Sequence, residues 1–131
     1  MSGENVETFL TGVQAINRGD IDGLLGTFDD GVVFLPLRSS LQGGYSGHDG
    51  VRKYLADTAE MFEAFFLEYG EVRDLGDEVL AIGTQHMRGH GSGQEIDLPQ
   101  AVVASFRDGK ITRVEAFANG REALNAVGLE D

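Results

Sequence analysis

Four strand-like segments follow one another between residues 67 and 118, and they constrain the fold more than any other feature of the sequence. The segments are LEYGEVRD, EVLAIGTQHMRG, EIDLPQAVVASF and KITRVEAFA, and the breaks between them fall at LGD, GSG and RDG. Glycine and aspartate in such short breaks favour tight turns, so consecutive segments are expected to pair as an antiparallel meander. A meander of this kind has an apolar face that helices elsewhere in the chain must cover.

The first half of the chain supplies those helices. Apolar residues recur at steps of three and four in residues 4–17, which predicts an amphipathic helix. Asp20 is a candidate N-cap for a short second helix whose apolar stripe reaches Phe28, and VVFLPL predicts a strand. A third helix is predicted to end near Tyr69, and REALNAVGL predicts a short last one. The positions of the third helix at helical spacing are Val51, Tyr54, Leu55, Thr58, Phe62, Phe65 and Phe66.

This order of elements predicts an α+β fold in a single domain that spans residues 1–131. We expect a curved, mixed, mostly antiparallel sheet wrapped around three N-terminal helices, with a short C-terminal helix. Such a sheet leaves a cone-shaped cavity between the two layers, and cavities of this kind are where small molecules usually bind.

The charge of the chain excludes several partners. The 22 acidic residues exceed the 10 Lys and Arg residues, and the formal net charge of −12 repels phosphate backbones and anionic lipid surfaces. No Cys is present, so disulfides, thiolate metal sites and a cysteine nucleophile are excluded. The N-terminal sequence has no signal-peptide pattern and no apolar run is long enough to cross a bilayer. We therefore expect a cytoplasmic protein that binds neither nucleic acid nor membranes.

Three segments carry a resemblance to a known family. AINRGDIDGLLGTFDDGVVF, GYSGHDGVRKYL and SFRDGKITRVEAFANGREALNAVGL, in this order, resemble the nuclear transport factor two-like superfamily, and most closely its SnoaL-like branch. The resemblance covers nearly the whole chain and implies the cone-shaped fold. It does not imply one activity, because this scaffold carries ketosteroid isomerases, polyketide cyclases, limonene epoxide hydrolases, dehydratases and members that only bind or dimerise.

The catalytic residues of these branches are replaced in this chain. The ketosteroid isomerase set, a tyrosine and two aspartates, corresponds by this resemblance to Gly12, Leu35 and Val102. The Asp-Arg-Asp set of limonene epoxide hydrolases corresponds to Gly83, Gln85 and Ala116. Asn119 stands where polyketide cyclase relatives often have an aspartate. The resemblance therefore leaves the catalytic residues, and the question whether the protein is an enzyme, open.

The segment TQHMRGHG raises a separate question, because it places two histidines and an arginine at alternate positions of a strand. The resemblance to the family implies that Gln85 faces the cavity. Because side chains alternate along a strand, His86, Arg88 and His90 are then expected on the outer face, where relatives contact a second subunit. The alternative is a strand register shifted by one residue, in which His86 would face the cavity and could act as an acid or base. Histidines four residues apart on a strand lie too far apart to hold one ion, so we expect no metal and no cofactor. The expected homodimer face consists of His86, Arg88, His90, Arg113, Glu115 and Phe117.

An apolar ligand cavity is expected on the inner face, and its small wall residues suggest a void that is large enough for a ring system. The expected lining is Leu35, Tyr54, Phe62, Gln85, Met87, Val102, Phe106, Val114, Ala116 and Ala118. Tyr45 and His48 are expected at the rim, with a role at the start of the third helix as the alternative for His48. Three functions remain open: an isomerase, cyclase or hydrolase acting by proton transfer on a small hydrophobic, cyclic molecule, a non-catalytic binder of such a molecule, and a dimeric interaction module.

Overall fold

The helices and strands come from a computed structural model, which describes residues 2–36 and 44–129. In chain order the elements are α1 (Ser2–Asn17), α2 (Ile21–Leu25), β1 (Phe28–Leu35), β2 (Tyr45–Ser46), α4 (Gly47–Met61), β3 (Phe62–Asp74), β4 (Glu78–Gly89), β5 (Glu95–Arg107), β6 (Lys110–Phe117) and α5 (Gly120–Ala126). Among the described residues, no helix is long and apolar enough to span a membrane.

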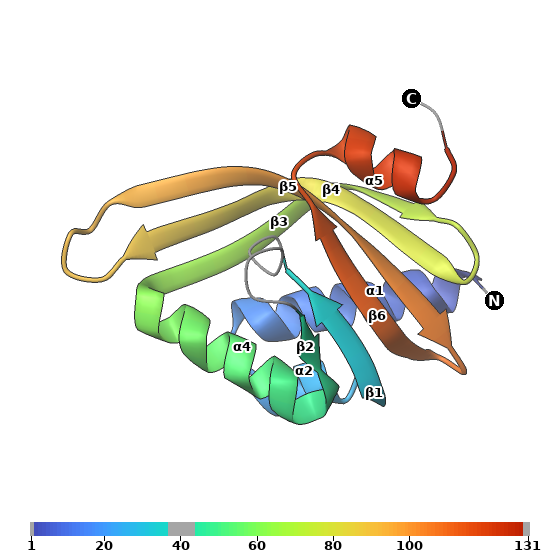
Figure 1. Ribbon diagram of the computed structural model, residues 1–131, viewed down its shortest axis with the longest axis horizontal. Coiled ribbons are helices and arrows are strands. Elements are labelled where there is room, and N and C mark those ends of the chain that lie inside the picture. The colour runs from blue at the N-terminus through green and yellow to red at the C-terminus, as the bar shows by residue number, and fades with distance from the viewer. Residues whose placement is uncertain (1, 37–43, 130–131) are drawn as a thin grey trace.

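The described strands form one curved sheet in the order β2-β1-β6-β5-β4-β3. Neighbouring strands are antiparallel except β1 and β6, which run parallel. The sheet arches over α1 and α4, whereas α5 lies on the opposite side of the sheet (Figure 1). The α+β fold, the meander and the C-terminal helix are thus confirmed.

The sheet is buried on both faces near its centre. Val79 and Ala81 of β4 pack on the inner face with residues of α1, whereas Leu80 between them belongs to a second cluster that includes Leu124 of α5. All three strand residues have an exposed fraction of 0%. This explains why the sequence of β4 is apolar without alternation at this point.

The boundary between α4 and β3 differs from the expected one. The helix ends at Met61, and β3 pairs with β4 from Phe62 opposite Gly89 to Asp74 opposite Val79. The prediction of a helix to Tyr69 was wrong because aromatic residues favour strands, and a long neighbouring strand supplies the hydrogen bonds. Phe66, whose helical spacing is typical of a residue on the buried stripe of a helix, is 48% exposed on this strand.

The start of the sheet also differs from the prediction. The side chain of Asp20 accepts a hydrogen bond from the Gly23 backbone N–H at 2.9 Å, which confirms it as the N-cap of α2. Phe28, however, is the first residue of β1 and not part of α2. The segment DDG is an irregularity inside β1, where the register with β6 shifts between Phe28 and Val33. The letters DDG are typical of a turn before the predicted strand VVFLPL, but here they lie inside the strand, which accommodates such residues in a bulge.

Candidate functional site

A cavity of about 70 Å³ lies between the helices and the inner face of the sheet. Its wall includes residues of α1, α2, α4 and the five strands β1, β3, β4, β5 and β6. The expected lining residues that the structure places on this wall are Leu35, Tyr54, Gln85, Val102, Val114 and Ala116. A cavity that binds benzene measures about 150 Å³, so this one is smaller than the ring-sized void that the sequence suggested.

Four further residues of the expected lining lie elsewhere. Phe62 and Met87 line an adjoining open hollow of about 260 Å³. Phe106 packs in the main core together with Val102 and Ala104 of the same strand, but it does not line the cavity. Ala118 is exposed, because β6 ends at the residue before it and the chain turns toward α5. The prediction was therefore wrong for Phe106 and Ala118.

The polar side of the cavity is a chain of three side chains. Gln85 Nε2 donates a hydrogen bond to Gln100 Oε1 at 2.7 Å, and Gln100 Nε2 donates one to the Tyr69 hydroxyl oxygen at 2.7 Å. All three residues line the cavity, and Gln100 is only 3% exposed. Hydrogen bonds in such a chain polarise one another, which fixes the three groups in place.

Gly83 makes this chain geometrically feasible. It lies opposite Tyr69 on β3 and opposite Gln100 on β5, so the residue between the two polar side chains has no side chain of its own. A Cβ atom at Gly83 would lie 1.9 Å from the Glu68 carbonyl oxygen and 2.7 Å from the Tyr69 Cα atom. Strands β3 and β4 therefore approach each other here as closely as only glycine allows.

Tyr69 and Gln85, the first and last side chains of this hydrogen-bonded series, each have a polar group without a partner among the described residues. Burial raises the pKa of the Tyr69 hydroxyl, so this group remains a neutral donor. No described residue accepts the Tyr69 hydroxyl proton, and none donates to Gln85 Oε1. Among the described residues, the Tyr69 hydroxyl therefore supplies a donor and Gln85 Oε1 an acceptor for a ligand.

The other described residues of the wall contribute no acid or base. None of them is Asp, Glu, His, Lys or Arg. Gly12, Leu35 and Val102, which correspond to the ketosteroid isomerase set, all lie on the wall. At each of these positions the cavity therefore has an apolar surface.

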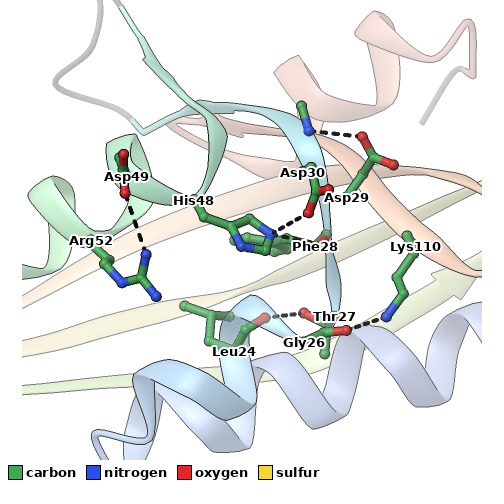
Figure 2. Close-up of polar contacts among 11 residues, drawn as sticks. Leu24, Gly26, Thr27, Phe28, Asp29, Asp30, His48, Asp49, Arg52 and Lys110 are labelled. Carbon is green, nitrogen blue, oxygen red and sulfur yellow. Dashed lines mark hydrogen bonds and ion pairs between the residues drawn. The ribbon is translucent and has the colours of Figure 1, made fainter.

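The two expected rim residues do not line the cavity. The ring centroid of Tyr45 lies 5.5 Å from that of Tyr54, and Tyr45 reaches the cavity only through this contact. His48 points toward the backbone of β1, where its Nε2–H donates to the Phe28 carbonyl at 3.1 Å, and the Asp30 carboxylate lies 3.8 Å away (Figure 2). The rim prediction for His48 was wrong because this histidine ties the start of α4 to β1.

Asn119 has a structural position as well. Its side chain accepts a hydrogen bond from the Glu122 backbone N–H at 2.9 Å and caps α5. Asn119 is exposed and does not line the cavity. The amide at this position is therefore explained by helix capping.

The outer face of the sheet carries a cluster of charged residues around His86. Its Nδ1 bonds to Asp97 at 2.8 Å and its Nε2 bonds to Glu68 at 2.9 Å. These hydrogen bonds, first the one to Glu68 and then the one to Asp97, raise the pKa of His86. The structure thus places Gln85 at the cavity and His86 on the outer face. Further ion pairs on this face include Arg88 with Glu95 and Arg113 with Glu115.

Two residues of the expected dimer face belong to other surroundings. Strand β4 ends at Gly89, and His90 in the following turn donates to the Ala59 carbonyl of α4 at 2.8 Å. Phe117 packs against the apolar cluster under α5. The prediction was wrong for His90 because the strand ends before it, and for Phe117 because a helix covers that part of the face.

The sequence reasoning missed Tyr69 and Gln100. The alternation of β5 contained a signal for Gln100, since this residue shares the inner face with Val102, two positions later. Tyr69 falls where the predicted third helix overlaps the predicted strand LEYGEVRD, so the sequence did not indicate which face its side chain occupies. Its contact with Gln100 depends on strand register, which the residues themselves do not reveal.

Known proteins similar to this chain were found at the level of family and of fold. The model of the SnoaL-like domain matches residues 6–114. Among solved structures, TerC, crystallised with polyporic acid, is 25% identical over 94% of this chain and 96% of TerC, with a TM-score of 0.78. An NTF2-like protein of unknown function from Burkholderia pseudomallei is 22% identical over 95% of this chain and 98% of its own, with a TM-score of 0.80.

A third solved structure shares the fold at lower identity. This protein from Catenulispora acidiphila has a ketosteroid isomerase-like fold and was crystallised in complex with trimethylamine. It is 17% identical over 94% of this chain and 93% of its own, with a TM-score of 0.77. A comparison with curated proteins gives no significant match.

Proposed function

The chain belongs to the SnoaL-like domain family, and we propose that it binds a small, largely apolar molecule in the cavity between its helices and its sheet. The observation that carries this proposal is the wall itself, which is apolar except for hydroxyl and amide groups such as those of Tyr69, Gln85 and Gln100. Apolar walls with a few fixed polar groups are typical of small-molecule sites. The structure of TerC with polyporic acid supports a small-molecule role for a similar protein.

Binding without chemistry fits the described wall better than proton transfer does. An isomerase, cyclase or hydrolase of this type needs a base within hydrogen-bond reach of its substrate. The described wall contains no carboxylate and no imidazole, and the raised pKa of Tyr69 keeps its hydroxyl protonated. Tyr69 can therefore orient a ligand oxygen but cannot remove a proton at neutral pH.

Two matched variants test the cavity. Ala116 lines it, whereas Ala118, two positions later, is exposed. Ala116→Val adds two methyl groups to the cavity and should weaken ligand binding about tenfold or more, whereas Ala118→Val should leave binding unchanged. Equal affinities of the two variants would contradict the cavity as the binding site.

The ligand itself is to be sought by native mass spectrometry of the purified protein, followed by denaturing extraction. A bound apolar small molecule would support the proposal and supply a compound class. Ligand at 100 times its Kd stabilises a protein by about 2.7 kcal/mol, which thermal unfolding detects readily. A ligand-free protein whose melting is unchanged by steroid, terpene and aromatic polyketide panels would favour the interaction module instead.

We also propose that the outer face of the sheet mediates a homodimer. Phe66 is 48% exposed there, and its ring centroid lies 6.1 Å from that of His86, which is flanked by Glu68 and Asp97. An exposed aromatic residue among charges of both signs suits a symmetric contact. Phe66→Glu should give a monomer in analytical ultracentrifugation, whereas Leu10→Glu, at an exposed apolar position of α1, should not. A monomeric wild type would contradict this proposal.

A further inference from the structure

The cavity and the adjoining hollow share part of their walls. Pro36, Tyr54 and Gln85 line both of them. The inner cavity measures about 70 Å³ and the hollow about 260 Å³. Gln85 therefore stands where a molecule would pass from one space into the other.

The two volumes divide a ligand into parts of different size. Benzene occupies a cavity of about 150 Å³, so the inner cavity holds only a short group of a few heavy atoms. The hollow is large enough for a ring. Because Tyr69, Gln85 and Gln100 all line the inner cavity, the short group is the part of a ligand that lies beside these polar side chains.

The chemistry of the inner cavity selects the kind of short group. The Tyr69 hydroxyl proton has no acceptor among the described residues, so a ligand oxygen that accepts a hydrogen bond satisfies it. A carboxylate or an ammonium group in the same place would have no described charged side chain as a partner. Burying a charge without a partner costs several kcal/mol, which favours an uncharged carbonyl or hydroxyl oxygen.

The hollow has the properties expected of a site for an apolar body. Met61 and Leu98 line it and are each 44% exposed, and Phe62 and Met87 contribute further apolar surface. When a ligand covers exposed apolar side chains around a concave surface, the burial of this apolar surface stabilises the complex. The flexible methionine side chains adapt to the shape of a ring.

We propose that the cavity and the hollow form one two-part site for an uncharged molecule with a short oxygen-bearing head and a ring-sized apolar body. The head accepts a hydrogen bond from Tyr69, and the body lies past Gln85 against Met61, Met87 and Leu98. This inference rests on the proposed binding function and names the chemical class and the orientation of the ligand.

Three probes with the same body test the head. Benzylacetone carries an uncharged ketone, butylbenzene carries no oxygen, and phenylbutyrate carries a carboxylate. Isothermal titration or NMR titration at neutral pH should show benzylacetone binding about tenfold more tightly than butylbenzene, the gain expected for one hydrogen bond. Phenylbutyrate should bind more weakly than benzylacetone. Equal affinities for the ketone and the hydrocarbon would overturn the assignment of the head.

Variants separate the two parts of the site. Tyr69→Phe should reduce the ratio of benzylacetone to butylbenzene affinity to about one, and Leu98→Ser should weaken both probes by the same factor. Tyr45→Phe removes a hydroxyl outside the cavity and should change neither affinity. Urea unfolding of each variant shows whether it is folded under the binding conditions.

The orientation can be read from the wild-type protein alone, so it does not depend on how well a variant folds. In methyl-labelled protein, the phenyl protons of benzylacetone should show nuclear Overhauser contacts to the Met61 and Met87 methyl groups, and its acetyl methyl should contact the Tyr69 ring. The reverse pattern would overturn the inference and leave the binding function standing. If none of the probes binds and no ligand is extracted from the protein, the binding function itself fails.

Discussion

Tyr69 and Gln100 should show strong energetic coupling in the ligand-free protein. Tyr69→Phe removes the acceptor of Gln100 Nε2, and the amide group is left in a position that is only 3% exposed. Leaving a buried donor unsatisfied costs about 1–3 kcal/mol, so we expect a loss of about 2 kcal/mol in the free energy of unfolding. Gln100→Met should lower the free energy of unfolding by a similar amount, because it removes the hydrogen-bond partner of both the Tyr69 hydroxyl and the Gln85 amide.

The double variant decides between coupling and independence. Once both Tyr69 and Gln100 are replaced by apolar residues, no polar group at their contact is left without a partner. The loss in the free energy of unfolding of the double variant should therefore be smaller, by about 1 kcal/mol or more, than the sum of the losses of the two single variants. Urea unfolding measures this, since a change of about 2 kcal/mol moves the midpoint by about 1 M at an m value of about 2 kcal/mol per M. Additivity within about 0.5 kcal/mol would refute the reasoning. Tyr45→Phe, whose hydroxyl makes no hydrogen bond in the described part of the chain, is the control and should change stability little.

Three further changes probe other parts of the molecule. Gly83→Ala places a methyl group against the backbone of β3 and should cost about 3 kcal/mol or more in urea unfolding, whereas Gly70→Ala, with no atom within 4 Å of the added Cβ, should cost far less. Glu68→Gln should lower the raised pKa of His86 in an NMR titration, and an unchanged titration curve would contradict the ion pair. The stability that protonated His86 contributes is present at acidic pH and is lost as pH rises through the pKa of His86 in the folded protein. The variant should therefore lose this stability at a lower pH than the wild type does. Leu80→Ala should destabilise the protein by about 2–5 kcal/mol in urea unfolding without changing ligand affinity, because Leu80 is fully buried on the face opposite the cavity; weakened binding would show that the faces are linked.

Elements with long, regular patterns were predictable from the sequence. Strand β4 spans Glu78–Gly89, the segment that its composition and flanking turns indicated. The helical spacing of Phe62, Phe65 and Phe66 was misleading, because the same residues are also good strand formers. Local pattern could not resolve this ambiguity, which pairing with β4 decides in the folded protein.

The candidate site was predictable only in part, for a related reason. The resemblance to the SnoaL-like branch implied that Gln85 faces the cavity, as the structure has it, and alternation then placed His86 on the outer face. The chain from Gln85 to Tyr69 needs three strands in a defined register and the missing side chain of Gly83, and such contacts between distant segments leave no local pattern. For His48, the sequence indicated a residue at the cavity rim, but in the structure this histidine holds the start of α4 to β1.

The parallel pairing of β1 with β6 has a consequence for the order of folding. Phe28 lies opposite Ile111, so this pairing closes a loop that contains most of the chain, whereas the meander from β3 to β6 needs only hairpins between consecutive strands. Closing the longer loop costs more entropy, and we expect it to follow the meander. The cavity wall needs both β1 and the meander, and is therefore assembled last. A bound ligand should accordingly slow unfolding in stopped-flow experiments and leave the folding rate nearly unchanged.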